Sequence, residues 1–382
     1  MNATMSSQEK IDIYGARRAK VAEALKARGI AAARFEDFEG MRDPSVRYLC
    51  GHPGDAFIII GADGSSALVA WDRNMADKMA SVDKIFSYTD FGRRSADAMS
   101  AVLAELGIKR GDKVEMPAAT PYPKFVDHVG ALEDWDLVCE AGGIDDTVLG
   151  MRALKDSGEL AIYERACALT DRLIDQLEEG VRAGRLATEL DVALFIEREA
   201  RAAGAEGTGF DTLAAGPRRS FGIHAFPNYG SGPFGTQGMS ILDFGIVVDG
   251  YTTDVTMSFV RGPLAPEQRT MVDLVKRAHD IGVAACGPGV AARDVASAVD
   301  AFFAEAGYSM PHALGHGVGL EAHESPGINL RQENDAVLAP GNIVTIEPGL
   351  YDPRFGGVRW EDDVLITETG ARQITASRIV EL

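Results

Sequence analysis

The sequence predicts an α/β (α+β) protein of two domains, a small amino-terminal domain over residues 1–150 and a larger domain over residues 151–382. Helix-type and strand-type patterns alternate in the first part, which is typical of a small sheet covered by helices. Long helical patterns open the second part, and strand patterns rich in Gly and Pro dominate from Arg218 onward. A length of 382 residues fits two or three domains.

The individual elements follow from apolar spacing and from the residues that interrupt it. Apolar residues recur at helical intervals over residues 10–28, and Gly29 follows as a stop signal. Two apolar runs flank the turn residues 61–64 and predict a hairpin. The expected helices cover residues 10–28, 94–106, 155–179, 190–203, 266–282 and 291–307. The expected strands cover residues 56–60, 66–71 and 112–116, and strands and turns fill residues 342–380.

Composition narrows the class of protein. The chain is 46% hydrophobic and 25% charged, as expected of a soluble globular protein. Its formal net charge of −19 disfavours a nucleic-acid partner, which requires a basic surface. No run reaches the roughly 18 apolar residues of a membrane helix, and the start, Met1–Lys10, has no apolar signal core.

The cysteine pattern indicates a reducing compartment. Four are scattered along the chain without a C-x-x-C pair, which favours free thiols in a reducing cytoplasm. They are Cys50, Cys139, Cys167 and Cys286. We therefore expect a cytoplasmic protein with neither a membrane nor a nucleic acid as its partner.

The most informative stretch covers residues 240–259, where two β-branched runs flank an Asp-Gly dipeptide at 249–250. That dipeptide is a strong signal for a two-residue hairpin turn. Counting back from the turn places Gly245 opposite Asp254, and Asp243 then points to the same face as Gly245. Asp243 and Asp254 are thus expected as diagonal neighbours, roughly 7–8 Å apart at the backbone, with Gly245 leaving space between them.

Two interpretations of this acidic pair remain open. Carboxylates directed at one point repel each other unless a cation or a shared proton lies between them. The alternative is two solvated acids on an exposed face. Asp243 favours the cation site, because it lies within the apolar run Ile-Leu-Asp-Phe-Gly, where a charge needs a partner.

Three of the seven histidines fall within residues 311–326, interleaved with glycines. They are His312, His316 and His323. The glycines permit close approach of the backbone to a ligand, and neutral imidazole is the commonest side-chain metal ligand. The segment therefore predicts a metal site, and the alternative is a glycine-rich turn with capping histidines.

Two further acids lie at or beside strand patterns near the carboxyl end. Glu347 ends an apolar run that Pro-Gly stops, and Glu361 follows Gly-Gly-Val-Arg-Trp. The alternative for either acid is an ordinary salt-bridged residue. Glu361 has Arg359 two positions before it and hence on the same strand face. Asp362 and Asp363 are interpreted as capping or surface acids without an assigned role.

Taken together, these motifs resemble the metallopeptidase family that includes Xaa-Pro dipeptidase (prolidase), aminopeptidase P, methionine aminopeptidase and creatinase. The matching residues, in order, are Asp243 and Asp254 with ten residues between them, His316 in His-Gly-Val-Gly, His323-Glu-Ser-Pro326, Ile346-Glu-Pro-Gly349 and Val358-Arg-Trp-Glu-Asp362. The stretch Val46-Arg-Tyr-Leu-Cys-Gly51 is similar to the amino-terminal domain of the family. The resemblance spans nearly the whole chain, with its specific motifs in the second half.

The resemblance implies a creatinase/prolidase-like domain over residues 1–150 and a pita-bread catalytic domain, a duplicated α/β arrangement around the active site, over residues 151–382. It implies that two metal ions are held by Asp243, Asp254, His316, Glu347 and Glu361. Asp254 and Glu361 would bridge the ions. Asp243 would hold one ion, and His316 and Glu347 the other.

The resemblance also implies substrate binding by His224, His312, His323 and Arg359, with Arg359 also supporting Glu361 from outside the metal cage. Such a donor set suits Mn²⁺, and also Co²⁺ or Zn²⁺. A hydroxide bridging the two ions would attack the amide carbon. His323 would stabilise the oxyanion and Glu347 would relay a proton, and His224 is the third catalytic candidate.

The implied activity is hydrolysis of the bond before proline, by an Xaa-Pro dipeptidase or an aminopeptidase acting on short proline-containing peptides. By analogy, a homodimer is expected. Departures from the family pattern at Trp360, at 220–224 and at 238–239 leave the substrate open.

Two other functions are alternatives. One is a hydrolase or lyase of a small osmolyte-like substrate. Gly245 weakens this option, because an osmolyte lyase is expected to carry an additional carboxylate near Asp243, and a creatinase would lack the five ligands. The other is a non-enzymatic binding protein on the same fold, which would be expected to lose ligands, whereas all five are present.

Overall fold

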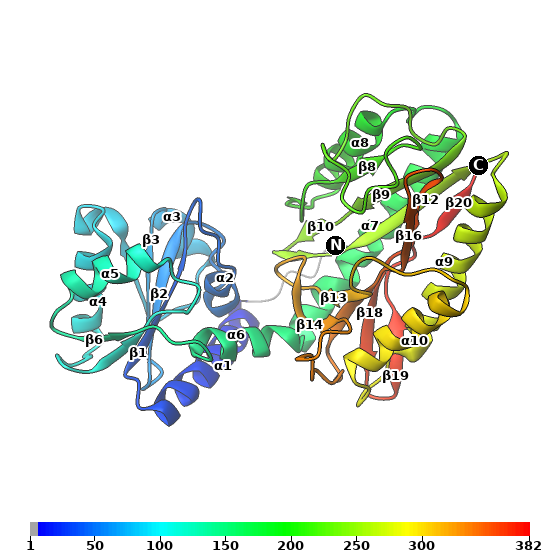
Figure 1. Ribbon diagram of the computed structural model, residues 1–382. Coiled ribbons are helices and arrows are strands. Elements are labelled where there is room, and N and C mark those ends of the chain that lie inside the picture. Colours follow the sequence, from blue (N-terminus) through cyan, green and yellow to red (C-terminus); the bar gives the residue numbers. More distant parts are fainter. Residues whose placement is uncertain (1–6) are drawn as a thin grey trace. The chain divides into compact units, whose positions relative to one another are not determined.

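Residues 7–382 are described by the computed structural model, with side chains from residue 13 onward, and the chain divides into two units (Figure 1). The first unit ends at Arg152 and the second begins at Ala153. Of the stretch expected to lack a signal core, residues 1–6 lie outside the described residues. Within the described part of the chain, no helix is both long and apolar enough to cross a membrane.

The first unit is built on a six-stranded mixed sheet in the order β4-β3-β2-β1-β5-β6. Its strands are β1 (Ala32–Asp37), β2 (Ala56–Gly61), β3 (Ser66–Ala70), β4 (Lys84–Ser87), β5 (Lys113–Glu115) and β6 (Asp136–Val138). Its helices are α1 (Ser7–Arg28), α2 (Ser45–Cys50), α3 (Arg73–Met79), the 3-10 helix η1 (Tyr88–Phe91), α4 (Ser95–Glu105), α5 (Tyr122–Ala131) and α6 (Ile144–Ala153). The predicted hairpin is confirmed by the antiparallel pairing of β2 with β3. The first helix ends as predicted, with Gly29 left-handed at a φ of 68°.

The second unit contains the four long helices that the sequence predicts. They are α7 (Ser157–Arg182), α8 (Glu189–Ala202), α9 (Pro266–Ala285) and α10 (Ala292–Glu305). Its first strands are β7 (Gly207–Thr208), β8 (Leu213–Ala215), β9 (Gly238–Phe244), β10 (Ile246–Val248), β11 (Tyr251–Thr252) and β12 (Val255–Arg261). The later strands are β13 (Gly315–Gly317), β14 (Glu324–Ile328), β15 (Ile343–Ile346), β16 (Gly349–Asp352), β17 (Gly356–Arg359), β18 (Asp362–Thr367), β19 (Gly370–Gln373) and β20 (Ile379–Glu381).

Two sheets, each covered by a pair of helices, form the body of the second unit. The sheet β20-β12-β9-β8 shares a core with α7 and α8, in which Leu173, Ile196 and Leu242 are buried. The sheet β14-β13-β15-β18-β19 shares a second core with α9 and α10. A single bridge between Thr256 and Glu361 joins the two sheets. Residues far apart in the sequence therefore meet where the sheets adjoin.

The hairpin predicted at Asp249-Gly250 is confirmed. Both turn residues are left-handed, with φ values of 49° and 90°, as a type I′ turn requires. Val248 pairs with Tyr251 in β10 and β11, and the same register continues in β9 and β12, where Asp243 pairs with Thr256. Asp243 and Asp254 therefore occupy the diagonal positions that the sequence predicts.

The role of Gly245 differs from the expectation that it leaves space between the two acids. A Cβ atom at this position would lie 1.9 Å from the carbonyl oxygen of Thr253 and 2.8 Å from Oγ1 of Thr252. The glycine is required because the facing backbone approaches it closely.

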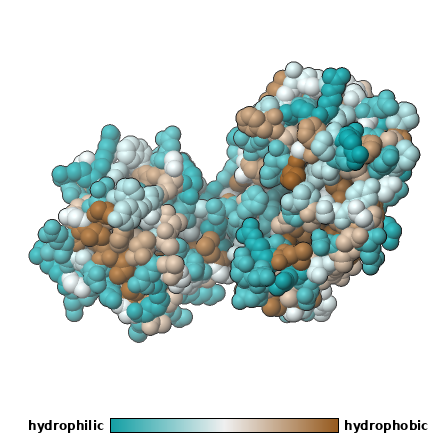
Figure 2. Space-filling view, in the orientation of Figure 1, coloured by the Kyte–Doolittle hydropathy of each residue, from teal (hydrophilic) through white to brown (hydrophobic). Residues whose placement is uncertain are grey.

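The surface and the thiols agree with the composition. Hydrophilic residues cover much of the face in Figure 2, and hydrophobic residues appear there in separate patches. All four cysteines are free, three of them buried.

Replacing Gly245 with alanine should destabilise the protein by about 1–3 kcal/mol, because the added Cβ overlaps the backbone of Thr253. Urea unfolding followed by circular dichroism measures the change. Gly370→Ala is the matched control, because a Cβ there meets no atom within 4 Å, and its effect should stay within about 0.5 kcal/mol. Equal unfolding midpoints for the two variants would contradict the account of Gly245.

Candidate metal centre

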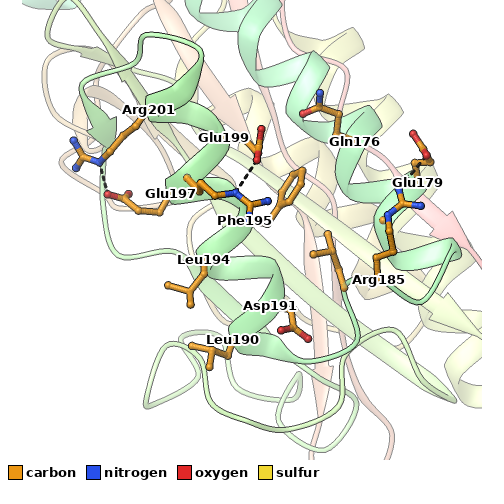
Figure 3. Close-up of a pocket in the computed structure, with 13 residues that line it drawn as sticks. Gln176, Glu179, Arg185, Leu190, Asp191, Leu194, Phe195, Glu197, Glu199 and Arg201 are labelled. Atoms are coloured by element: carbon orange, nitrogen blue, oxygen red, sulfur yellow. Dashed lines mark hydrogen bonds and ion pairs between the residues drawn. The ribbon is translucent and has the colours of Figure 1, made fainter.

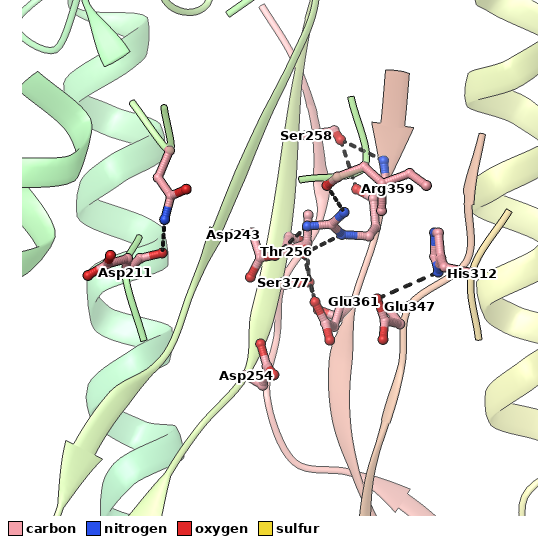
Figure 4. A network of polar contacts seen from close by, with 12 residues as sticks. Asp211, Asp243, Asp254, Thr256, Ser258, His312, Glu347, Arg359, Glu361 and Ser377 are labelled. Carbon is pink, nitrogen blue, oxygen red and sulfur yellow. Dashed lines mark hydrogen bonds and ion pairs between the residues drawn. The ribbon is translucent and has the colours of Figure 1, made fainter. Parts of the chain in front are cut away.

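A cavity of about 580 Å³ in the second unit brings together the side chains that the sequence singles out. Its wall includes the five candidate ligands Asp243, Asp254, His316, Glu347 and Glu361. It also includes the three candidate pocket histidines His224, His312 and His323. Figure 4 shows the acidic groups of this site side by side on neighbouring strands.

Strand ends of both sheets place the acids and the imidazole. Asp243 lies on β9, and Asp254 stands one residue before β12. His316 is the middle residue of β13, whereas Glu347 directly follows β15. Glu361 directly precedes β18 and pairs with the backbone of β12. The join between the two sheets is thus what assembles the donor set.

Three of the side chains come close enough to share one ion. Ligand atoms of Asp254, His316 and Glu361 all lie within 4.8 Å of one another. Nε2 of His316 also lies 3.4 Å from Oε1 of Glu347 and 3.8 Å from Oδ2 of Asp254. Oxygen donors with one imidazole nitrogen fit a hard or borderline divalent ion.

Burial changes the protonation of these groups. It raises the pKa of Glu347 to about 8. It raises the pKa of Asp254 and of Glu361 well above the usual range, and neighbouring carboxylates add to this effect. Burial lowers the pKa of His316 to about 4, so this imidazole is neutral near pH 7. A cation would favour the ionised carboxylates, and neutral imidazole is the ligating form, so the group fits a metal site.

Asp243 divides its two oxygens between two tasks. Oδ2 forms an ion pair with the guanidinium of Arg359. Oδ1 is buried and has no hydrogen-bond partner. A buried carboxylate oxygen without a donor is costly, and it would be satisfied by a cation in the cavity.

Arg359 links several parts of the site. The sequence places it behind Glu361, and it reaches that acid through Thr256: Nε donates to Oγ1 of Thr256 at 2.9 Å, and this hydroxyl donates to Glu361 at 2.7 Å. Its direct partner is Asp243. Nη1 also donates to the hydroxyl of Tyr351 at 2.9 Å. Arg359 therefore holds two of the acids in place, although it is not part of the cavity wall.

Sequence reasoning missed Thr256 and Tyr351. Thr256 could have been found, because the hairpin register places it opposite Asp243. Tyr351 had no signal. Its hydroxyl contacts Nε2 of His312 at 3.1 Å, and burial raises its pKa to about 12.

Asp362 and Asp363, which the sequence left as capping or surface acids, are fully buried, so the surface alternative is wrong. Asp363 accepts a hydrogen bond from the backbone of Asp254 at 3.2 Å. Asp362 accepts from Nε1 of Trp360 at 2.9 Å, and Trp360 stacks on His279 with ring centroids 4.1 Å apart. Trp360, which departs from the family pattern, thus contributes to the packing behind Glu361.

The three pocket histidines differ in their surroundings. His312 is largely buried, and burial lowers its pKa to about 4. His323 is exposed, and its ring centroid lies 4.2 Å from that of His316. His224 is exposed on the loop between β8 and β9. All three therefore remain available to a molecule in the cavity.

A larger hollow of about 890 Å³ lies on α7 and α8, away from these residues. Figure 3 shows Arg201 paired with Glu197, and Arg198 forms an ion pair with Glu199 at 2.8 Å. Neither histidine nor cysteine lines it. It does not offer the chemistry of the first cavity.

Buried acids and a neutral imidazole around a cavity at the join of two helix-covered sheets define a metallohydrolase. The chain belongs to metallopeptidase family M24, whose family model matches residues 161–368. An uncharacterized peptidase of Bacillus subtilis, YqhT, is 31% identical over 338 residues, which cover 87% of this chain and 91% of that protein. The chain is therefore a metallopeptidase.

Solved structures of related proteins confirm the predicted α/β fold of the pita-bread type. The X-Pro aminopeptidase of Thermotoga maritima matches with a TM-score of 0.83 at 26% identity, covering 96% of this chain and 99% of that one. The prolidase of Pyrococcus furiosus matches with a TM-score of 0.79 at 26% identity, covering 93% and 99%. In sequence, the Xaa-Pro dipeptidase of Pyrococcus furiosus is 37% identical over 234 residues, which cover 61% of this chain and 66% of that protein.

In chelator-treated protein, the free energy of unfolding should fall as pH rises from about 6.5 to about 8, above the ordinary pKa of His312 and His316, whose lowered pKa values act in the opposite sense at lower pH. The unfolded chain releases the Glu347 proton near 4.5, whereas the folded chain retains it to about 8. The folded state therefore binds more protons in this window, and stability declines with pH. Urea titrations at several pH values measure the slope. Glu347→Gln should make it shallower, and identical slopes would contradict the raised pKa.

Proposed function

We propose that this metallopeptidase hydrolyses the peptide bond before proline, with two divalent metal ions in the cavity of the second unit. The observation that supports the proposal most strongly is the convergence of five candidate ligands and three histidines on one wall. The similarity to an Xaa-Pro dipeptidase in sequence and to an X-Pro aminopeptidase in structure supports the substrate class.

The donor set divides between the two ions by position. Asp254 and Glu361 would bridge the ions, because each has two carboxylate oxygens and they lie within 4.8 Å of each other with His316. Asp243 would hold one ion through its unpartnered Oδ1. His316 and Glu347 would hold the other. Four carboxylates to one imidazole favour Mn²⁺, with Co²⁺ or Zn²⁺ also suited.

Bound divalent ions supply a water molecule of lowered pKa and polarise the scissile carbonyl. The protein's own residues supply the remaining steps. His323 lies beside His316 at the cavity, where its imidazole can donate a hydrogen bond to the carbonyl oxygen as negative charge develops. Glu347 lies on the same cavity wall, where its carboxylate can relay a proton to the leaving nitrogen.

This proton transfer is particularly important when the leaving amine is proline. Its nitrogen carries no hydrogen in the peptide, so the leaving amine must receive a proton in good geometry. His312 and His224 lie on the cavity wall, where they can orient the substrate. The tether from His312 to the hydroxyl of Tyr351 would keep its ring fixed during binding.

The protein loaded with Mn²⁺ should cleave an Xaa-Pro dipeptide, a Xaa-Pro-Yaa tripeptide, or both. Release of the amino-terminal residue is measured by liquid chromatography. Cleavage of the dipeptide alone identifies a dipeptidase, and cleavage of the tripeptide identifies an aminopeptidase. If neither is cleaved while metal is bound, the proposal for proline peptides fails, and a small non-peptide substrate becomes the alternative.

Asp254→Asn should lower metal content below that of the wild type and reduce turnover by more than ~100-fold, because a bridging carboxylate is lost. Metal is measured by atomic emission after gel filtration, and turnover with the better peptide. The matched control is Asp249→Asn in the turn of the same hairpin, where Asn-Gly is equally favoured. An active Asp254→Asn variant with full metal content would contradict the assignment of Asp254 as a ligand.

A further inference from the structure

The loop that carries His224 lacks regular secondary structure. It runs from Gly216 to Gly232 between β8 and β9 and contains neither helix nor strand. His224 lies near its centre and reaches the cavity wall. A loop of this kind is mobile unless side chains fix it, so the placement of His224 depends on anchors outside the loop.

One buried side chain, Glu189 at the start of α8, binds both ends of this loop. Its Oε1 accepts hydrogen bonds from the backbone of Gly216 at 2.7 Å and from Nε of Arg219 at 3.0 Å. Its Oε2 accepts from the backbone of Gly230 at 2.8 Å. Glu189 is only 2% exposed. Hydrogen bonds to a buried carboxylate are charge-assisted and stronger than neutral ones.

The glycines of the loop fit this carboxylate closely. A Cβ at Gly216 or Gly230 would lie 3.2 Å or 3.3 Å from an oxygen of Glu189. At Gly216 it would also lie 2.1 Å from the carbonyl of Pro233. Small residues therefore bring two separate backbone segments to one carboxylate.

The far part of the loop is tied to the metal centre. The carbonyl of Ile223 accepts a hydrogen bond from Nη1 of Arg359 at 3.2 Å, and Arg359 pairs with Asp243. Arg219 donates to the carbonyl of Pro227 at 2.7 Å, on the other side of His224. His224 thus lies between contacts that lead to Glu189 at the base and to Arg359 at the cavity.

We propose that Glu189 is a positioning residue for substrate binding: it clamps the loop 216–232 so that His224 faces the metal centre. Glu189 is not among the residues that line the cavity. The inference rests on the proposed function, because it takes His224 to contact the peptide. It assigns to a helix residue a role in orienting the substrate.

The variant Glu189→Gln keeps the size of the side chain but replaces one accepting oxygen with an amide that cannot accept. It should raise KM and lower kcat/KM by about 10- to 100-fold, the effect of a displaced positioning group. Metal content and kcat should change far less. The matched control is Asp191→Asn on the same helix (Figure 3), whose carboxylate accepts from the backbone of Thr188 at 2.9 Å and of Ala187 at 3.2 Å and has no hydrogen bond to the loop 216–232 among the described contacts.

A double-mutant cycle separates positioning from general damage. In a His224→Ala background, Glu189→Gln should cost less than about threefold in kcat/KM, because the group that it positions is gone. Equal losses with and without His224 would overturn the proposal.

Hydrogen exchange tests the clamp without reference to activity. Glu189→Gln should speed exchange in peptides covering residues 216–232, because the bonded amides of Gly216 and Gly230 are released, whereas Asp191→Asn should not. Unchanged exchange would overturn the proposal. If the wild type cleaves no proline peptide, the proposed function fails, and the exchange result still decides whether Glu189 holds the loop.

Discussion

The antiparallel register between β9 and β12 is the constraint on which the metal centre depends. The Asp-Gly turn at 249–250 fixes this register, because its two left-handed residues allow only one pairing of the flanking strands. A slip by one residue would turn every side chain of a strand to the opposite face. Asp243 and Asp254 would then separate, so two turn residues determine whether the acids meet.

The second constraint is the balance of charge around the acids. Four carboxylates converge on one cavity, and the guanidinium of Arg359 pairs with one of them, Asp243. Burial lowers the pKa of Arg359, but Tyr351, Asp243 and the other acids raise it by more. The guanidinium therefore stays charged. One guanidinium compensates only part of this charge. The remainder favours divalent ions, which explains why buried acids are tolerated here.

The two hairpins, the four long helices and the meeting of the two aspartates could be predicted from local sequence. The turn chemistry, the apolar spacing and the crowding of histidines are all short-range signals. Gly245 shows the limit of this reasoning. The pattern placed it correctly, yet its role follows from the close approach of Thr253, which is visible only in three dimensions.

Contacts between segments that are distant in the chain could not be predicted from the sequence. Arg359 and Asp243 are 116 residues apart, and their ion pair depends on the packing of β17, which carries Arg359, against β9. Glu189 gave no signal either, because a glutamate at a helix start is ordinarily a surface residue at the positive end of the dipole. Its buried bonds to Gly216 and Gly230 result from the path of the loop. The local sequence thus predicts the metal ligands better than it predicts the residues that position the site.

The central claim is that two ions share the carboxylates of Asp254 and Glu361. Diffraction from crystals soaked in Mn²⁺, recorded near the manganese absorption edge, tests it most directly. The account predicts two anomalous peaks in the cavity, each in contact with both of these carboxylates. A single peak, or two peaks without a common carboxylate, would contradict it.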